Sequence, residues 1–132
     1  MKKEEVFYSI EQFEKAFKRL SEIIKRPLDD IARDAGIQRF EFTFELMWKA
    51  LKIYLGFMGR ECKTPRDALK EAFKQGMLSG EDVFLRMLDD RNLSSHTYKE
   101  STAKEIFERI ELEYVDAFKK LVSELKKRYN TL

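Results

Sequence analysis

The chain has 132 residues, enough for one domain with a core, and its 43% hydrophobic and 38% charged residues exclude a disordered chain. No apolar run approaches the roughly 20 residues of a membrane span, and the single cysteine, Cys62, cannot form an intrachain disulfide. We therefore expect one domain over residues 1–132 of a cytoplasmic protein, with no membrane partner.

Apolar residues recur every three or four positions along most of the chain, which predicts amphipathic helices. The first helix covers about residues 6–24 and is ended by Pro27. The second and longest begins after a candidate N-cap, Asp29, runs over about residues 30–58, and has a weak point at Gly36. It carries two apolar stripes, as expected for a central bundle helix: Ile37, Phe40, Phe44, Trp48, Leu51 and Leu55, and then Phe42, Leu46, Ile53 and Phe57.

The second half of the sequence predicts two shorter helices and a third long one. Thr64-Pro65-Arg66-Asp67 is a typical helix start, and that helix ends at Gly76. Ser79-Gly80-Glu81-Asp82 opens the next helix, which stops near Arg91. The last helix carries inward apolar residues from Ala103 to Leu125 and runs to the C-terminus. The expected fold is therefore all-α, an up-and-down bundle of about five helices.

The chain has a net charge of only +2, but the charges are unevenly distributed. Residues 49–74 contain seven basic and three acidic side chains, whereas residues 81–116 contain ten acidic and five basic ones. A polyanion would prefer the basic stretch. This counts against a nucleic-acid groove centred on the acidic stretch, unless the fold or a second copy brings basic residues to it.

The segment 91–98 contains the residues best suited to chemistry. His96 is the only histidine in the chain, and its unperturbed pKa lies nearest neutrality, so it can both accept and donate a proton there. Arg91 is permanently charged and suits a phosphate or a carboxylate, and Tyr98 adds a phenol. We expect any catalysis to involve this segment.

The spacing of Arg91 and His96 leaves alternatives open. Five residues of continuous α-helix rotate a side chain by about 140°, so the two would point apart. They converge only if the helix breaks between them or if two copies of the segment meet in a dimer. The eight residues alone favour a third interpretation, a helix N-terminus capped by serine with His96 on the surface.

A polar row separates the two apolar stripes of the long helix: Gln38, Glu41, Glu45, Lys49 and Lys52. One interpretation is a solvated face with a Glu45–Lys49 pair, which periodicity alone favours. The other is that Glu41 and Glu45 face a polar cleft and orient Arg91 or His96. The sequence contains neither a phosphate-binding glycine loop nor a cysteine–histidine cluster, so we expect no metal and no cofactor.

Two segments together resemble a known family. Residues 33–49 read RDAGIQRFEFTFELMWK, and Thr64-Pro65-Arg66-Asp67 then precedes the Arg-x4-His-x-Tyr pattern of residues 91–98. In this order they resemble the nucleotidyltransferase substrate-binding protein family, the HepT-like branch of the HEPN superfamily. The resemblance covers nearly the whole chain and implies the four-helix-bundle-like HEPN fold.

The resemblance also implies a homodimer encoded beside a small nucleotidyltransferase, in a toxin–antitoxin pair. It implies a metal-independent ribonuclease, with RNA as substrate, in which Arg91 and His96 form the catalytic pair. Asn92 matches a polar residue that commonly follows the arginine in this family. The resemblance further implies that the partner enzyme silences the toxin by adding AMP at Tyr98. One histidine per chain supplies one proton-transfer group, and a symmetric dimer would supply two.

Two other functions remain open. The older family name suggests a non-catalytic subunit that binds and presents a substrate to the nucleotidyltransferase. A third hypothesis, from a different class, is a plain helical interaction protein in which His96 is structural.

Overall fold

A computed structural model of the protein describes residues 2–95 and 99–132, and within these ranges the all-α prediction is confirmed. The helices are α1 (Lys3–Ile24), α2 (Asp30–Phe57), α3 (Pro65–Lys74), α4 (Glu81–Ser94), α5 (Glu100–Arg109), the π-helical turn η1 (Ile110–Tyr114) and α6 (Val115–Tyr129). None of the helices in the described part of the chain is both long and apolar enough to cross a membrane.

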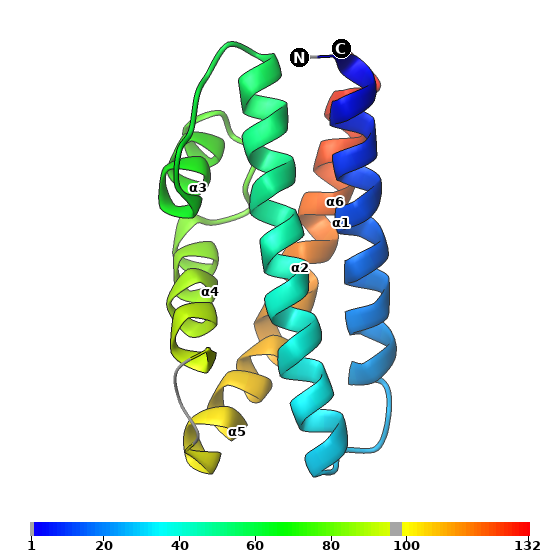
Figure 1. Ribbon diagram of the computed structural model, residues 1–132, viewed down its shortest axis with the longest axis vertical. Coiled ribbons are helices and arrows are strands. Elements are labelled where there is room, and N and C mark those ends of the chain that lie inside the picture. Colours follow the sequence, from blue (N-terminus) through cyan, green and yellow to red (C-terminus); the bar gives the residue numbers. More distant parts are fainter. Residues whose placement is uncertain (1, 96–98) are drawn as a thin grey trace.

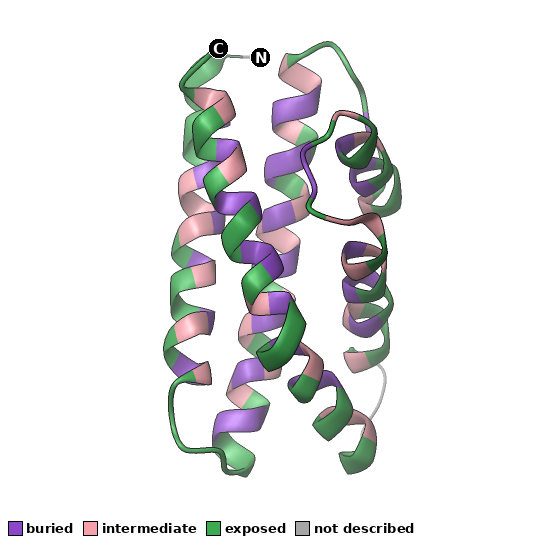
Figure 2. Cartoon of the chain, turned by 180° about the vertical axis from the view of Figure 1, so that it is seen from behind, coloured by how far each residue is buried: buried purple, intermediate pink, exposed green. Residues whose placement is uncertain are grey.

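The long helix α2 is the centre of the fold (Figure 1). It packs against α1 on one side and against the shorter α3 and α4 on the other. The helices α5 and α6, joined by η1 without a loop, form one diagonal that crosses behind α2 and also contacts α1. The buried residues lie on the inner faces of all these helices, as Figure 2 shows.

The predicted helix starts are confirmed by their cap contacts. The Asp29 carboxylate accepts a hydrogen bond from the backbone N–H of Ala32 at 2.7 Å. The Thr64 hydroxyl accepts one from the backbone N–H of Asp67 at 3.1 Å, ahead of Pro65. These bonds satisfy donors that the first helical turn leaves unpaired, which is why these residue types mark the boundaries in the sequence.

The second apolar stripe of α2 is partly buried, as expected for a central helix, and one of its four residues is exposed. Leu46, Ile53 and Phe57 are partly buried against the core, but Phe42 is 58% exposed. Phe42 lines a pocket between α1 and α2, where its ring remains exposed.

Gly36 is a point of close packing and not a weak point of α2. A Cβ atom on Gly36 would lie 2.6 Å from Cε2 of Phe107, whose ring is buried. The absence of a side chain therefore allows α5 to cross α2 closely. This crossing sets the position of the first turns of α5, beside the end of α4.

Candidate functional site

An ion pair between α2 and α4 fixes Arg91. Nη2 of Arg91 donates to Oε2 of Glu45 at 2.8 Å, and Nη1 donates to Oδ1 of Asn92 at 3.1 Å. The guanidinium also lies 5.9 Å from the ring centroid of Phe44. The Arg91 side chain is 32% exposed, so it is oriented by its neighbours and still reaches the surface.

A second contact joins the same two helices one turn further on. The hydroxyl groups of Ser94 and Ser95 lie 2.7 and 3.0 Å from Oε2 of Glu41. Each also lies within hydrogen-bond distance of the Arg91 carbonyl oxygen, at 3.1 and 3.0 Å, so each hydroxyl donates to one of two acceptors at a time. Glu41 therefore holds the C-terminal end of α4 against α2.

These positions test two of the three interpretations of the segment 91–98, and the meeting of two copies in a dimer stays a prediction. The helix ends at Ser94, so it does break between Arg91 and His96. The serine-capped N-terminus is wrong, because both serines lie at the C-terminal end of α4, and the residue before α5, Lys99, makes no side-chain cap bond. His96 and Tyr98, with Thr97, lie outside the described residues.

Both interpretations of the polar row on α2 hold in part. Glu45 pairs with Lys49 at 3.5 Å, as a solvated helix face requires. The same carboxylate binds Arg91, and Glu41 binds the two serines, as a polar cleft requires. Glu45 thus lies between two cations, Lys49 and Arg91.

A buried charged cluster lies on the other side of α4. The Asp90 carboxylate accepts two hydrogen bonds from Arg109 of α5, from Nε at 2.7 Å and from Nη2 at 2.9 Å. The Tyr114 hydroxyl of η1 donates to the same carboxylate. Asp90 is 4% exposed, and the Tyr114 ring stacks on Phe40 of α2 with centroids 5.4 Å apart. The residue directly before Arg91 is thus fixed to α5 and η1.

The ionisation states in this cluster follow from its geometry. Burial raises the pKa of the Tyr114 phenol above its ordinary value, and the bond to Asp90 raises it further. The bond to Asp90 raises the pKa of Arg109 despite the opposing effect of burial. At neutral pH the Tyr114 phenol therefore keeps the proton that it donates to Asp90, and the Arg109 guanidinium is charged.

Sequence reasoning missed this cluster. The buried residues Phe84, Met87 and Leu88 of α4 continue at helical spacing to Asp90, which the charge distribution along the sequence does not single out. A carboxylate at an inward-facing position of a helix could have predicted the cluster, because a buried charge requires a partner.

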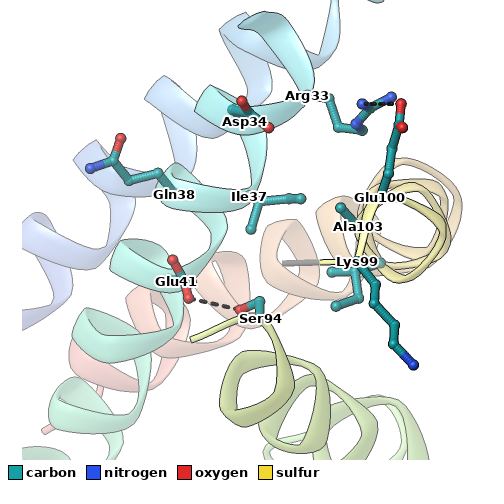
Figure 3. Close-up of a pocket in the computed structure, with 10 residues that line it drawn as sticks. Arg33, Asp34, Ile37, Gln38, Glu41, Ser94, Lys99, Glu100 and Ala103 are labelled. Atoms are coloured by element: carbon teal, nitrogen blue, oxygen red, sulfur yellow. Dashed lines mark hydrogen bonds and ion pairs between the residues drawn. The ribbon is translucent and has the colours of Figure 1, made fainter. Parts of the chain in front are cut away.

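A pocket of about 540 Å³ opens beside the Glu41 contact. It is bounded by the first half of α2, the end of α4 and the first turns of α5. Figure 3 shows the Glu41–Ser94 contact at one side and Arg33 with Glu100 at another. The lining residues are Arg33, Asp34, Ile37, Gln38, Glu41, Ser94, Lys99, Glu100, Ala103 and Ile106.

The match to a known family covers most of the chain. Residues 8–127 match the family described as nucleotidyltransferase substrate binding protein like. The chain belongs to this family. The family resemblance of the Gln38–Glu45 block and the Arg-x4-His-x-Tyr pattern is thereby confirmed.

One protein similar to this member of the nucleotidyltransferase substrate binding family has a name that states an activity. A Haemophilus influenzae protein called probable ribonuclease HepT is 28% identical over 117 residues, which are 80% of this chain and 77% of that protein. A Thermus thermophilus protein of known structure is 36% identical, with a TM-score of 0.74 over 89% of this chain and 98% of its own.

A more distant structure shares the fold. The tri-AMPylated HEPN toxin of Shewanella oneidensis, solved in complex with its MNT antitoxin, is 15% identical. Its TM-score is 0.74, over 92% of this chain and 96% of that one. At this identity the likeness establishes the helical architecture and not the activity.

Proposed function

We propose that the protein is the HepT-like toxin of a two-gene toxin–antitoxin pair, a metal-independent ribonuclease neutralised by a partner nucleotidyltransferase. The observation that carries the proposal is the partly exposed guanidinium of Arg91. It is fixed by Glu45 at the end of a helix, five residues before the only histidine. The Haemophilus relative named as a probable ribonuclease HepT supports it. The Shewanella toxin bound to its antitoxin supports the kind of partner.

The chemistry assigns a role to each residue. Metal-free cleavage of RNA needs a base for the 2′-hydroxyl, an acid for the leaving oxygen and a cation for the phosphorane. His96 exchanges the protons, and Arg91 stabilises the negative charge. A guanidinium has five N–H donors, and the bonds of Arg91 to Glu45 and Asn92 use two of them. Glu45 and Glu41 position Arg91 and the end of α4.

We further propose that the active species is a homodimer. A single histidine cannot be the acid and the base of the same step, and two copies would supply two. The exposed Phe42 ring, on the helix that carries Glu41 and Glu45, offers apolar surface for such an interface. In this case the His96 segments of the two copies lie near each other.

The activity is tested with purified protein and single-stranded RNA in excess chelator. We expect cleavage by the wild-type protein and none by His96→Ala, because the substitution removes the only imidazole of the chain, which is the proposed proton-transfer group. Sedimentation velocity gives the oligomeric state of the same samples. Equal cleavage by His96→Ala, or a requirement for added metal, contradicts the proposal.

Neutralisation is expected to occur at Tyr98. When the protein is co-expressed with the nucleotidyltransferase encoded beside it, intact-mass spectrometry should show AMP adducts, because an anionic nucleotide next to His96 would exclude RNA. Tyr98→Phe should carry no adduct and remain toxic. The control is Tyr8→Phe, at a 63% exposed tyrosine of α1, which should be modified like the wild type. Unmodified wild-type protein beside an active partner contradicts this mechanism.

A non-catalytic subunit that presents a substrate to the nucleotidyltransferase is the second candidate. It is favoured by a Haemophilus influenzae structure, 22% identical with a TM-score of 0.67, described as a substrate binding domain of a nucleotidyltransferase. The pocket beside Glu41 offers a binding site for such a substrate. Nucleotide transfer to a third molecule that requires this chain, without RNA cleavage, would favour this function over the first.

A further inference from the structure

The polar row of α2 changes the sign of its charge where it passes Arg91. Its carboxylates end at Glu45, and Lys49 and Lys52 follow on the same face. Over residues 46–57 the helix carries no carboxylate. A polyanion that reaches Arg91 is therefore repelled along the first half of α2 and attracted along the second half.

One carboxyl group connects Lys49 to the proposed catalytic arginine. Oε1 of Glu45 lies 3.5 Å from Nζ of Lys49, and Oε2 accepts the 2.8 Å hydrogen bond from Arg91. Because the two cations share a single carboxylate, the three groups together carry a positive charge. The Lys49 side chain is 54% exposed, and an ammonium group has three donors, so Lys49 can contact a second anion while it pairs with Glu45.

Lys52 extends the positive surface along the helix. It follows Lys49 by three residues, so the two side chains are neighbours on one face of α2, about 4.5 Å apart along the helix axis. Lys52 is exposed, and its Nζ lies 5.7 Å from the ring centroid of Trp48. The ring itself is packed against the core, so this contact limits the positions that the flexible lysine adopts.

The fold removes an obstacle that the charge distribution along the sequence presents. Arg91 belongs to the acidic stretch, but Glu45 joins it to Lys49, the first residue of the basic stretch. The two acidic residues directly before Arg91 are engaged elsewhere. Asp90 is buried against a guanidinium of α5, and Asp89 pairs with an arginine of α3 at 3.8 Å. A polyanion at Arg91 therefore has basic residues beside it.

We propose that Lys49 and Lys52 bind phosphates of single-stranded RNA next to the cleavage site, so that the strand leaves Arg91 along the second half of α2. This inference rests on the proposed ribonuclease function and names the surface that holds its substrate. Lysine side chains neutralise backbone phosphates whatever the base, and such contacts supply affinity and orientation without sequence preference. Single strands are commonly bound along positively charged surfaces of this kind.

The binding test uses His96→Ala protein, which is not expected to cleave, and a labelled single-stranded RNA followed by fluorescence anisotropy at several salt concentrations. Lys49→Gln and Lys52→Gln, each added to this protein, should weaken binding by up to about fivefold, the usual strength of an exposed charge pair. Each should also lower the slope of log affinity against log salt by about 0.7, because one phosphate contact is lost. Lys49→Arg retains the charge and should bind like the His96→Ala parent.

Lys120→Gln is the matched control. Lys120 of α6 is 61% exposed and pairs at 3.0 Å with a carboxylate four residues before it, as Lys49 pairs with Glu45. This variant should keep the affinity and the salt slope of the parent. A slope that both α2 substitutions leave unchanged, or that Lys120→Gln lowers equally, overturns the RNA surface, as does an absence of RNA binding.

Cleavage by proteins that retain His96 gives the second readout. Lys49→Gln should need more RNA than the wild type to reach half of its maximal rate, whereas Arg91→Ala should cleave slowly even at saturating RNA. If RNA binds with the expected dependence on Lys49 and Lys52 but is not cleaved, the ribonuclease proposal fails and the RNA surface stands. If RNA is cleaved and both lysine variants bind it like the parent, the ribonuclease proposal stands and the RNA surface fails.

Discussion

Replacing Asp90 with alanine is expected to lower the free energy of unfolding by about 3–5 kcal/mol, the usual cost of removing one partner of a buried ion pair. The substitution leaves the Arg109 guanidinium without its bidentate acceptor and the buried Tyr114 hydroxyl without its partner. Urea unfolding followed by circular dichroism measures the loss. It is expected to be among the largest for any single polar residue of the described chain.

The neighbouring aspartate is a matched control. Asp89 has an exposed side chain, and it pairs with Arg66 of α3 at 3.8 Å. Asp89→Ala is expected to change the stability by no more than about 1 kcal/mol, as for other surface pairs. A similar loss from both substitutions would contradict the assignment of Asp90 as the residue that joins α4 to α5 and η1.

Arg91→Ala is expected to reduce RNA cleavage by about 10²–10³-fold, the typical cost of removing one group that stabilises transition-state charge. The fold should persist, because Arg91 lies in the last turn of α4 and is 32% exposed. Single-turnover cleavage rates and the urea midpoint, measured on the same protein, separate the two effects. Arg91→Lys should restore only part of the rate, since a lysine cannot contact Glu45 and Asn92 through a planar fork.

The same helix offers a control cation. Arg86 is exposed and pairs with Glu113 at 3.0 Å, away from the pocket and from Glu45. Arg86→Ala should cleave RNA at the wild-type rate. Equal rates for Arg91→Ala and the wild type, with both folded, would remove Arg91 from the mechanism and favour the substrate-presenting subunit.

Much of the fold was predictable because its signals are local. Helix α2 begins after Asp29 and α3 after Thr64, as expected, because a cap is a contact between residues three apart in the chain. The apolar period places Phe40 and Phe44 in the core for the same reason. The contact of Glu45 with Arg91 was predictable only as one of two interpretations of the polar row. Periodicity alone favours the other interpretation, a solvated helix face.

The helices, their caps and the segment that carries the candidate chemistry follow from the order of the residues, because they depend on neighbours within a few positions of the chain. Which charges meet depends instead on how the helices pack. Asp90 and Arg109 lie on different helices, and their pairing depends on how closely α5 crosses α2 at Gly36. The exposure of Phe42 and the pocket around Arg33 were decided in the same way, because burial depends on which helix lies opposite and not on the pattern of one helix alone.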